Sequence, residues 1–185
     1  MIKRTLSLVL LLGLPLAASA QDLETHPGYV DLSALEAAMV GHATAHLDFD
    51  HAALASFLNA AGTADPQITA LVDSIAEVRI RAFDLDTAQI EEVRSRLADA
   101  ADQLRGAGWG TLASVHDDED NVWVFMKSDG THVVGLVAMY GDDDGAGFVH
   151  VMGEIDAAQV MAAVMQHSQD LRQLLTTVKG EAGEP

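Results

Sequence analysis

The sequence contains no cysteine. Disulfide bonds, catalysis by a thiol and metal sites built on thiolates are therefore excluded. The cysteine of a lipobox is absent too, so we expect no lipid anchor of the bacterial lipoprotein type. No serine lies in a Gly-x-Ser-x-Gly motif. The glycine-rich segment Gly106–Gly110 follows an expected helix instead of opening one, so it offers no free helix amides to a phosphate. We expect no cofactor.

Basic residues are scarce. The chain has 10 Lys and Arg against 28 Asp and Glu, which gives a formal net charge of −18. Such a surface repels the phosphates of nucleic acids and anionic lipids, so a nucleic-acid function is excluded. The charge favours solubility, and attraction of a cationic partner is the alternative.

Residues 1–20 have the pattern of a cleavable export signal. A Lys-Arg pair precedes an apolar run from Leu6 to Leu16, and Ala18-Ser19-Ala20 supplies the small side chains that signal peptidase accepts. The run is shorter than the roughly 20 residues that span a bilayer, which disfavours a retained anchor. We expect a periplasmic or secreted product that begins at Gln21 and has no membrane anchor.

An aspartate pattern predicts where helices begin. An aspartate that follows one apolar residue and precedes another by four can cap a helix, while the two apolar residues pack as a hydrophobic staple. The pattern predicts helix starts at Asp31, Asp50, Asp86 and Asp156. The Asp86 helix is expected to end near Arg105. The Asp156 helix is expected to end near residue 178, with fraying or a break near His167-Ser168.

Runs rich in β-branched, aromatic or alternating apolar residues predict strands at 43–49, 76–83, 109–116, 122–127, 132–140 and 148–155. Short turn-like connections join the last four into a meander. The order of elements predicts an α+β fold, with one mainly antiparallel sheet of about six strands and helices packed on it. The expected organisation is a signal peptide (1–20), an N-terminal arm with the first helix (21–40), a single domain (41–178) and a disordered tail (179–185).

Histidines and carboxylates are densest in residues 42–51. His42, His46, Asp48 and His51 are the candidate metal ligands, although no standard ligand spacing is matched. Simpler roles compete, because a histidine near a helix end and an aspartate cap are common. We expect no bound metal.

Arg79 and Arg81 alternate along one expected strand, so they share a face. In a chain with few cations, they are candidates for contact with an anion or a partner. The favoured interpretation is a cross-strand ladder with neighbouring Asp or Glu.

Both faces of the central strands are apolar. Trp123 and Phe125 alternate with Val122, Val124 and Met126. A sheet with one solvated face should alternate apolar and polar residues, so the second face needs a cover.

The sequence leaves two alternatives for what covers the second face of the sheet. The helices that begin at Asp31 and Asp156 would lie on the side opposite the Asp86 helix, or the face would bind a protein partner or a second copy of the chain. In the second case Trp123 and Phe125 are the candidate interaction residues.

The chain also resembles a known bacterial family. A Gly-Trp opens a strand at Trp109, a hairpin strand ends in Lys127, and the run Val133–Val137 precedes the segment Phe148–Asp156. These features, together with the strand at Ala76–Phe83, are similar to the family of domain of unknown function DUF4252. The resemblance implies a small exported or lipid-anchored envelope protein with no assigned activity, and a connection to envelope-stress regulation.

We therefore expect a non-enzymatic envelope protein that acts by binding or signalling. The alternative is an uncharacterised metal-binding protein or hydrolase that uses the cluster from His42 to His51.

Overall fold

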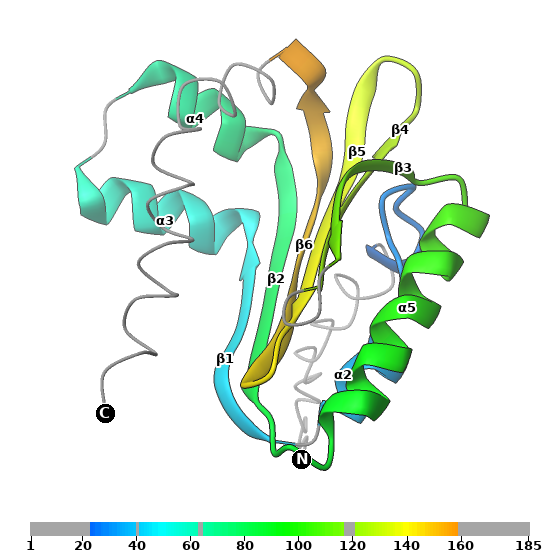
Figure 1. Ribbon diagram of the computed structural model, residues 1–185. Coiled ribbons are helices and arrows are strands. Elements are labelled where there is room, and N and C mark those ends of the chain that lie inside the picture. The colour runs from blue at the N-terminus through cyan, green and yellow to red at the C-terminus, as the bar shows by residue number, and fades with distance from the viewer. Residues whose placement is uncertain (1–22, 40, 63–64, 117–120, 159–185) are drawn as a thin grey trace, which may run out of the picture.

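The computed structural model describes residues 23–39, 41–62, 65–116 and 121–158 (Figure 1). It confirms the α+β expectation, with one six-stranded sheet and helices packed on it. The elements in chain order are α2 (Ser33–Ala38), β1 (His42–Asp50), α3 (His51–Ala61), α4 (Pro66–Asp73), β2 (Ile75–Asp84), α5 (Ile90–Gly106), β3 (Gly110–His116), β4 (Asn121–Ser128), β5 (His132–Gly141) and β6 (Gly145–Asp156).

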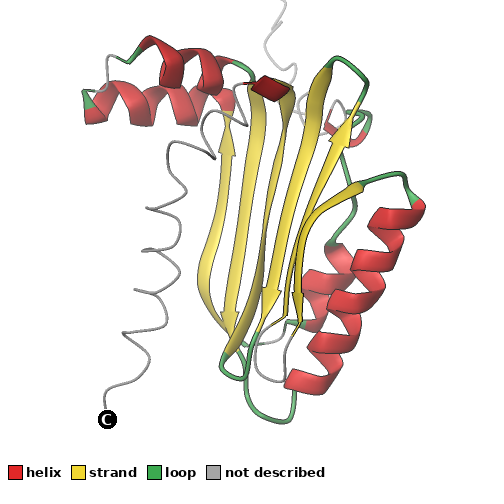
Figure 2. Cartoon of the chain, turned by 45° about the horizontal axis from the view of Figure 1, so that its top comes forward, coloured by secondary structure: helices red, strands yellow, loops and turns green. Residues whose placement is uncertain are grey.

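The sheet is antiparallel throughout and has the order β1-β2-β6-β5-β4-β3. Strands β3 to β6 form the expected meander. β2 pairs with the free side of β6, and β1 completes that edge. The connection from β2 to β3 therefore runs from the second strand of the sheet to the edge strand at its far end, and it contains α5. α3 and α4 project beside β1, on the far side of the molecule from α5 (Figures 1 and 2).

The hydrophobic core lies between α5 and one face of the sheet. On one side of α5, buried residues recur every three or four positions, and each is at most 1% exposed: Val93, Leu97, Ala101 and Leu104. They form one cluster with large side chains of β4, β5 and β6, among them Phe125 and Phe148. Each large apolar side chain buried in this way stabilises the fold by about 1.5–3 kcal/mol.

α2 packs against α5. Leu35 and Met39 belong to the same core cluster as the α5 side chains. The expectation that the Asp31 helix covers the opposite face is therefore wrong, because its apolar residues complete the core beneath α5. The predicted Asp156 helix lies outside the described residues beyond Ala158, as do the export signal and the tail.

Three of the four predicted helix-start aspartates accept backbone hydrogen bonds. The carboxylates of Asp31, Asp50 and Asp156 accept from the amides of Ser33, Ala53 and Ala158 at 2.9, 2.7 and 2.7 Å. The helix start at Asp31 is wrong despite this contact, since α2 begins at Ser33 with Leu32 as its N-cap and no side-chain cap. The start at Asp86 is also wrong, since residues 87–89 form turns and α5 begins at Ile90 with no side-chain cap.

Candidate functional site

One face of the sheet is apolar across its full width, and we call it the open face. Residues directly opposite each other on paired strands point to the same side of a sheet, so the register identifies its members. Three rows of paired residues make it up: Phe49, Val78, Val151, Leu136, Met126 and Gly110; Leu47, Ile80, Val149, Ala138, Val124 and Ala113; and Ala45, Ala82, Gly147, Tyr140, Val122 and Val115.

The open face differs sharply in burial from the face beneath α5. Its side chains are half-buried or exposed, with Leu47 at 43% and Val115 at 53% exposed. On the neighbouring positions of the same strands, Phe125 and Val137 point the other way and are 0% exposed. One apolar face is thus the core, and the other is only partly covered.

The size and chemistry of the open face suit an apolar partner. Six strands at about 4.8 Å spacing are roughly 24 Å wide, and successive rows lie about 7 Å apart. The resulting patch of a few hundred Å² is in the range that marks interaction sites. Its one titratable side chain is Tyr140, whose pKa is raised by burial and by the charges of Asp142 and Asp84. The face is therefore uncharged near neutral pH and offers no acid–base group.

The two aromatic interaction candidates lie in the core. Trp123 is 6% exposed and Phe125 is 0% exposed, both beneath α5 and α2. The larger side chains of this strand pack under the helices, and the smaller Val122 and Val124 face outward. Val122 and Val124, and not the aromatic pair, are therefore the residues of β4 that lie on the open face together with Met126.

Arg81 lies on the core side of the sheet among acidic and carbonyl oxygens. Its Nε donates to Glu36 Oε1 at 2.9 Å, and its Nη2 lies 3.0 Å from Asp48 Oδ1. Its Nη1 donates to the carbonyls of Leu47 and Ile80 at 3.0 Å. These bonds join α2, β1 and β2, so Arg81 has a structural role.

Arg79 lies two residues earlier on the same side. Its Nε donates to Glu77 Oε1, and its guanidinium lies 5.7 Å from the centre of the Tyr29 ring. Both arginines are therefore engaged by groups of this chain.

The candidate metal ligands are spread along β1 and the first residue of α3. His42 begins the strand opposite Asp84, whereas His51 begins α3, with its Nδ1 3.3 Å from the Val72 carbonyl. His46 and Asp48 share a side, where His46 Nε2 is 3.9 Å from Asp48 Oδ2. Within the described residues, no group of three or more His, Asp or Glu could hold a metal ion.

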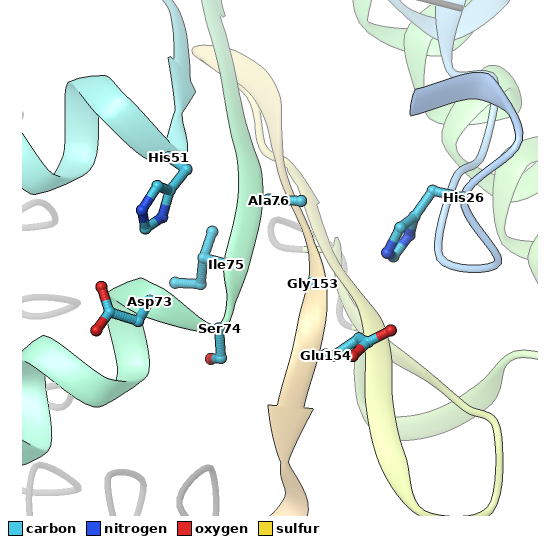
Figure 3. Close-up of a pocket in the computed structure, with 8 residues that line it drawn as sticks. All are labelled: His26, His51, Asp73, Ser74, Ile75, Ala76, Gly153 and Glu154. Atoms are coloured by element: carbon cyan, nitrogen blue, oxygen red, sulfur yellow. The ribbon is translucent and has the colours of Figure 1, made fainter. Parts of the chain in front are cut away.

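A pocket of about 460 Å³ at the ends of β2 and β6 escaped sequence reasoning (Figure 3). It brings together distant residues: His26, His51, Asp73, Ser74, Ile75, Ala76, Gly153 and Glu154. In the figure, His26 lies across the strands from His51 and Asp73. Ser74 Oγ donates to the Leu71 carbonyl at 2.6 Å. Among the described contacts, none joins two ionisable side chains of this pocket.

His150 is a buried polar group on the core side, 1% exposed. Its Nε2 donates to the Gly28 carbonyl at 2.9 Å. Burial lowers its pKa to about 4, and the positive charge of Arg79 acts in the same direction, while the Gly28 carbonyl opposes both. A Cβ on Gly28 would lie 1.8 Å from the Val134 carbonyl oxygen, so only glycine permits this close approach. His150 thus fixes the N-terminal arm to the sheet.

Comparison with known proteins supports the sequence resemblance. The model of the family described as Domain of unknown function (DUF4252) matches residues 48–163, more than half of the chain. No curated protein and no solved structure matches. No helix in the described ranges is long and apolar enough to cross a membrane.

Proposed function

We propose, on the premise that the chain belongs to the family of domain of unknown function DUF4252, that it is an exported, non-enzymatic envelope protein. In this proposal it acts by binding a protein segment on its open face. Signalling in the envelope-stress response is the setting that the resemblance implies.

The observation that carries this proposal is the continuity of the open face. Three rows of apolar residues cross the sheet without a charged side chain. A solvated antiparallel sheet normally has a polar outer side, because exposed apolar area is unfavourable in water. Apolar residues at all three of these rows are best explained by contact with another apolar surface.

The charge of the chain indicates what kind of segment binds. The face itself is apolar, whereas the chain has a net charge of −18. An acidic partner would be repelled, while a neutral or basic segment with one apolar side would not be. An amphipathic helix whose polar side is neutral or basic therefore fits best.

The remaining described sites support binding over catalysis. Arg81 and His150 are held by internal hydrogen bonds. His46 lies beside Glu36 and Asp48, near the guanidinium of Arg81. Export is supported by the Lys-Arg pair, the apolar run and the Ala18-Ser19-Ala20 site.

Site-specific photocrosslinking in the native host tests the proposal. Benzoylphenylalanine is placed at Val149, at the centre of the open face, or at Ser95 on the exposed side of α5 as the matched control. We expect a discrete crosslinked protein from Val149 and not from Ser95. Mapping of the crosslink should find a neutral or basic amphipathic segment.

Two results would refute partner binding at this face. One is that Val149 and Ser95 yield the same set of crosslinked proteins. The other is that Val149 crosslinks to no second protein in the envelope.

A further inference from the structure

We propose that the segment Ala157–Val178 of this chain docks on the open face as an amphipathic helix. The docking stands on the features of this chain alone, and the partner of the proposed function would compete with the segment for the same face.

The first support is the place where the segment begins. β6 is the third of six strands in the sheet order, so the chain leaves the sheet from its interior and not from an edge. Asp156 ends the strand, its carboxylate accepts from the Ala158 amide at 2.7 Å, and residues 157 and 158 are already helical. A segment that leaves the sheet here can reach either face. One face is filled by α2 and α5, which leaves the open face.

The second support is the residue pattern of the segment. Apolar residues recur at spacings of three, four and seven, which places them on one side of a helix. They are Val160, Val164, Leu171, Leu175 and Val178. Glutamines and threonines dominate the opposite side. Met161 borders the apolar stripe and adapts readily to an irregular surface, whereas His167 and Ser168 are the polar residues that interrupt the stripe.

The length of the segment as a helix also matches the length of the strands. A helix of 22 residues is about 33 Å long at 1.5 Å per residue, and a strand of 10 residues is about 33 Å long. A helix is about 10–12 Å across, a little more than two strand spacings, so it covers the central strands and leaves the sheet edges. Val149 on β6 is central and is the position to test.

Charge favours this segment over a second copy. The segment contains one acidic residue, Asp170, and one basic residue, Arg172, so its formal charge is zero. A second copy would bring another net charge of −18 against this chain. The segment thus has the properties inferred for a partner: it is apolar on one side and not acidic.

The absence of cysteine makes a thiol-labelling test possible on the full chain. Val149→Cys supplies a single thiol on the open face. Three apolar positions of the segment are then changed together, Val164→Asp, Leu171→Asp and Leu175→Asp, to prevent docking. Modification by a maleimide reports the fraction of time that the face is uncovered.

The matched control adds the same three charges to the polar side of the segment, by Gln166→Asp, Gln169→Asp and Gln173→Asp. A second reporter, Ser95→Cys, is exposed on α5. Trp109 and Trp123 are both buried, so their fluorescence verifies that each variant is folded.

We expect the Val149→Cys thiol to react about tenfold faster when the three apolar positions carry aspartate, which corresponds to about 1.4 kcal/mol of docking free energy. The glutamine variants should react as slowly as the parent, and the Ser95→Cys thiol should react equally in all. Equal Val149→Cys rates in every background would overturn the proposal. So would slow labelling that speeds up on dilution, because a second copy would then be the cover.

A second measurement holds even if the aspartate variants do not fold. In the purified full chain, benzoylphenylalanine at Val149 should crosslink within the chain to the segment 157–178. The absence of this internal crosslink would contradict docking, whereas the proposed function fails separately if the envelope yields no second protein.

Discussion

Mild acid should destabilise the domain through His150. The imidazole is 1% exposed, and its Nε2 donates to the Gly28 carbonyl at 2.9 Å. Burial, with a smaller contribution from Arg79, lowers its pKa to about 4. The neutral form is therefore the one that the folded protein holds.

The sign of the effect follows from the two protonation states. Between the unfolded pKa of about 6.5 and the folded value of about 4, the unfolded chain binds a proton that the folded chain does not. Stability therefore falls as the pH falls through this window. The loss is about 2 kcal/mol between pH 7 and pH 5 and roughly 3 kcal/mol by pH 4. For a chain of this size, a loss of about 2 kcal/mol lowers the melting temperature by roughly 4–8 °C.

Urea unfolding at pH 7 and pH 5 measures the loss of unfolding free energy, with His150→Gln as the test variant. Glutamine can still donate to the Gly28 carbonyl but does not titrate. We expect the loss of unfolding free energy between the two pH values to be smaller by about 2 kcal/mol in His150→Gln. His42→Gln, at an exposed position, serves as the control and should behave like the parent. An identical pH response of the parent and His150→Gln would refute the assignment to His150.

Three other predictions follow from the core, the β1 histidines and the export signal. Phe125→Ala should reduce the free energy of unfolding by about 3–5 kcal/mol in urea titration, because a 0% exposed aromatic leaves a cavity; a loss below about 1 kcal/mol would mean that it is not a core residue. Thermal melts with and without a chelator should coincide; a drop of several degrees with chelator would restore His42, His46, Asp48 and His51 as ligands. The intact mass of protein from the native host should correspond to a chain that begins at Gln21, and a mass that includes residues 1–20 would rule out cleavage.

Local chemistry explains why much of the fold was predictable. The meander from β3 to β6 follows from short turns between runs of β-branched residues. The cap at Asp50 depends on contacts within one turn of α3, so it was correct. The start at Asp86 was wrong because the Asp86 amide donates to the Gln89 side chain at 3.2 Å and a turn intervenes before α5.

Non-local packing explains what the sequence could not provide. The position of β2 beside β6 depends on pairing between strands about 70 residues apart, for which no local pattern exists. The alternation in β4 predicted two apolar faces, but not which of them is the core. Trp123 and Phe125 lie on the buried side because α2 and α5 both pack there. The pocket between His26 and His51 likewise unites segments with no common motif.

The distinction between a core face and a binding face is tested most directly by one pair of variants, Val149→Asp and Val137→Asp. The two positions lie on adjacent strands, β6 and β5, but on opposite faces, since Val137 pairs with His150 and Val149 pairs with Ala138. Val137 is 0% exposed, and an unpaired charge there should cost more than about 4 kcal/mol in urea unfolding. Val149→Asp should cost less than about 2 kcal/mol and keep the fluorescence of buried tryptophan. Equal unfolding of both variants would contradict the assignment of the open face as a binding surface.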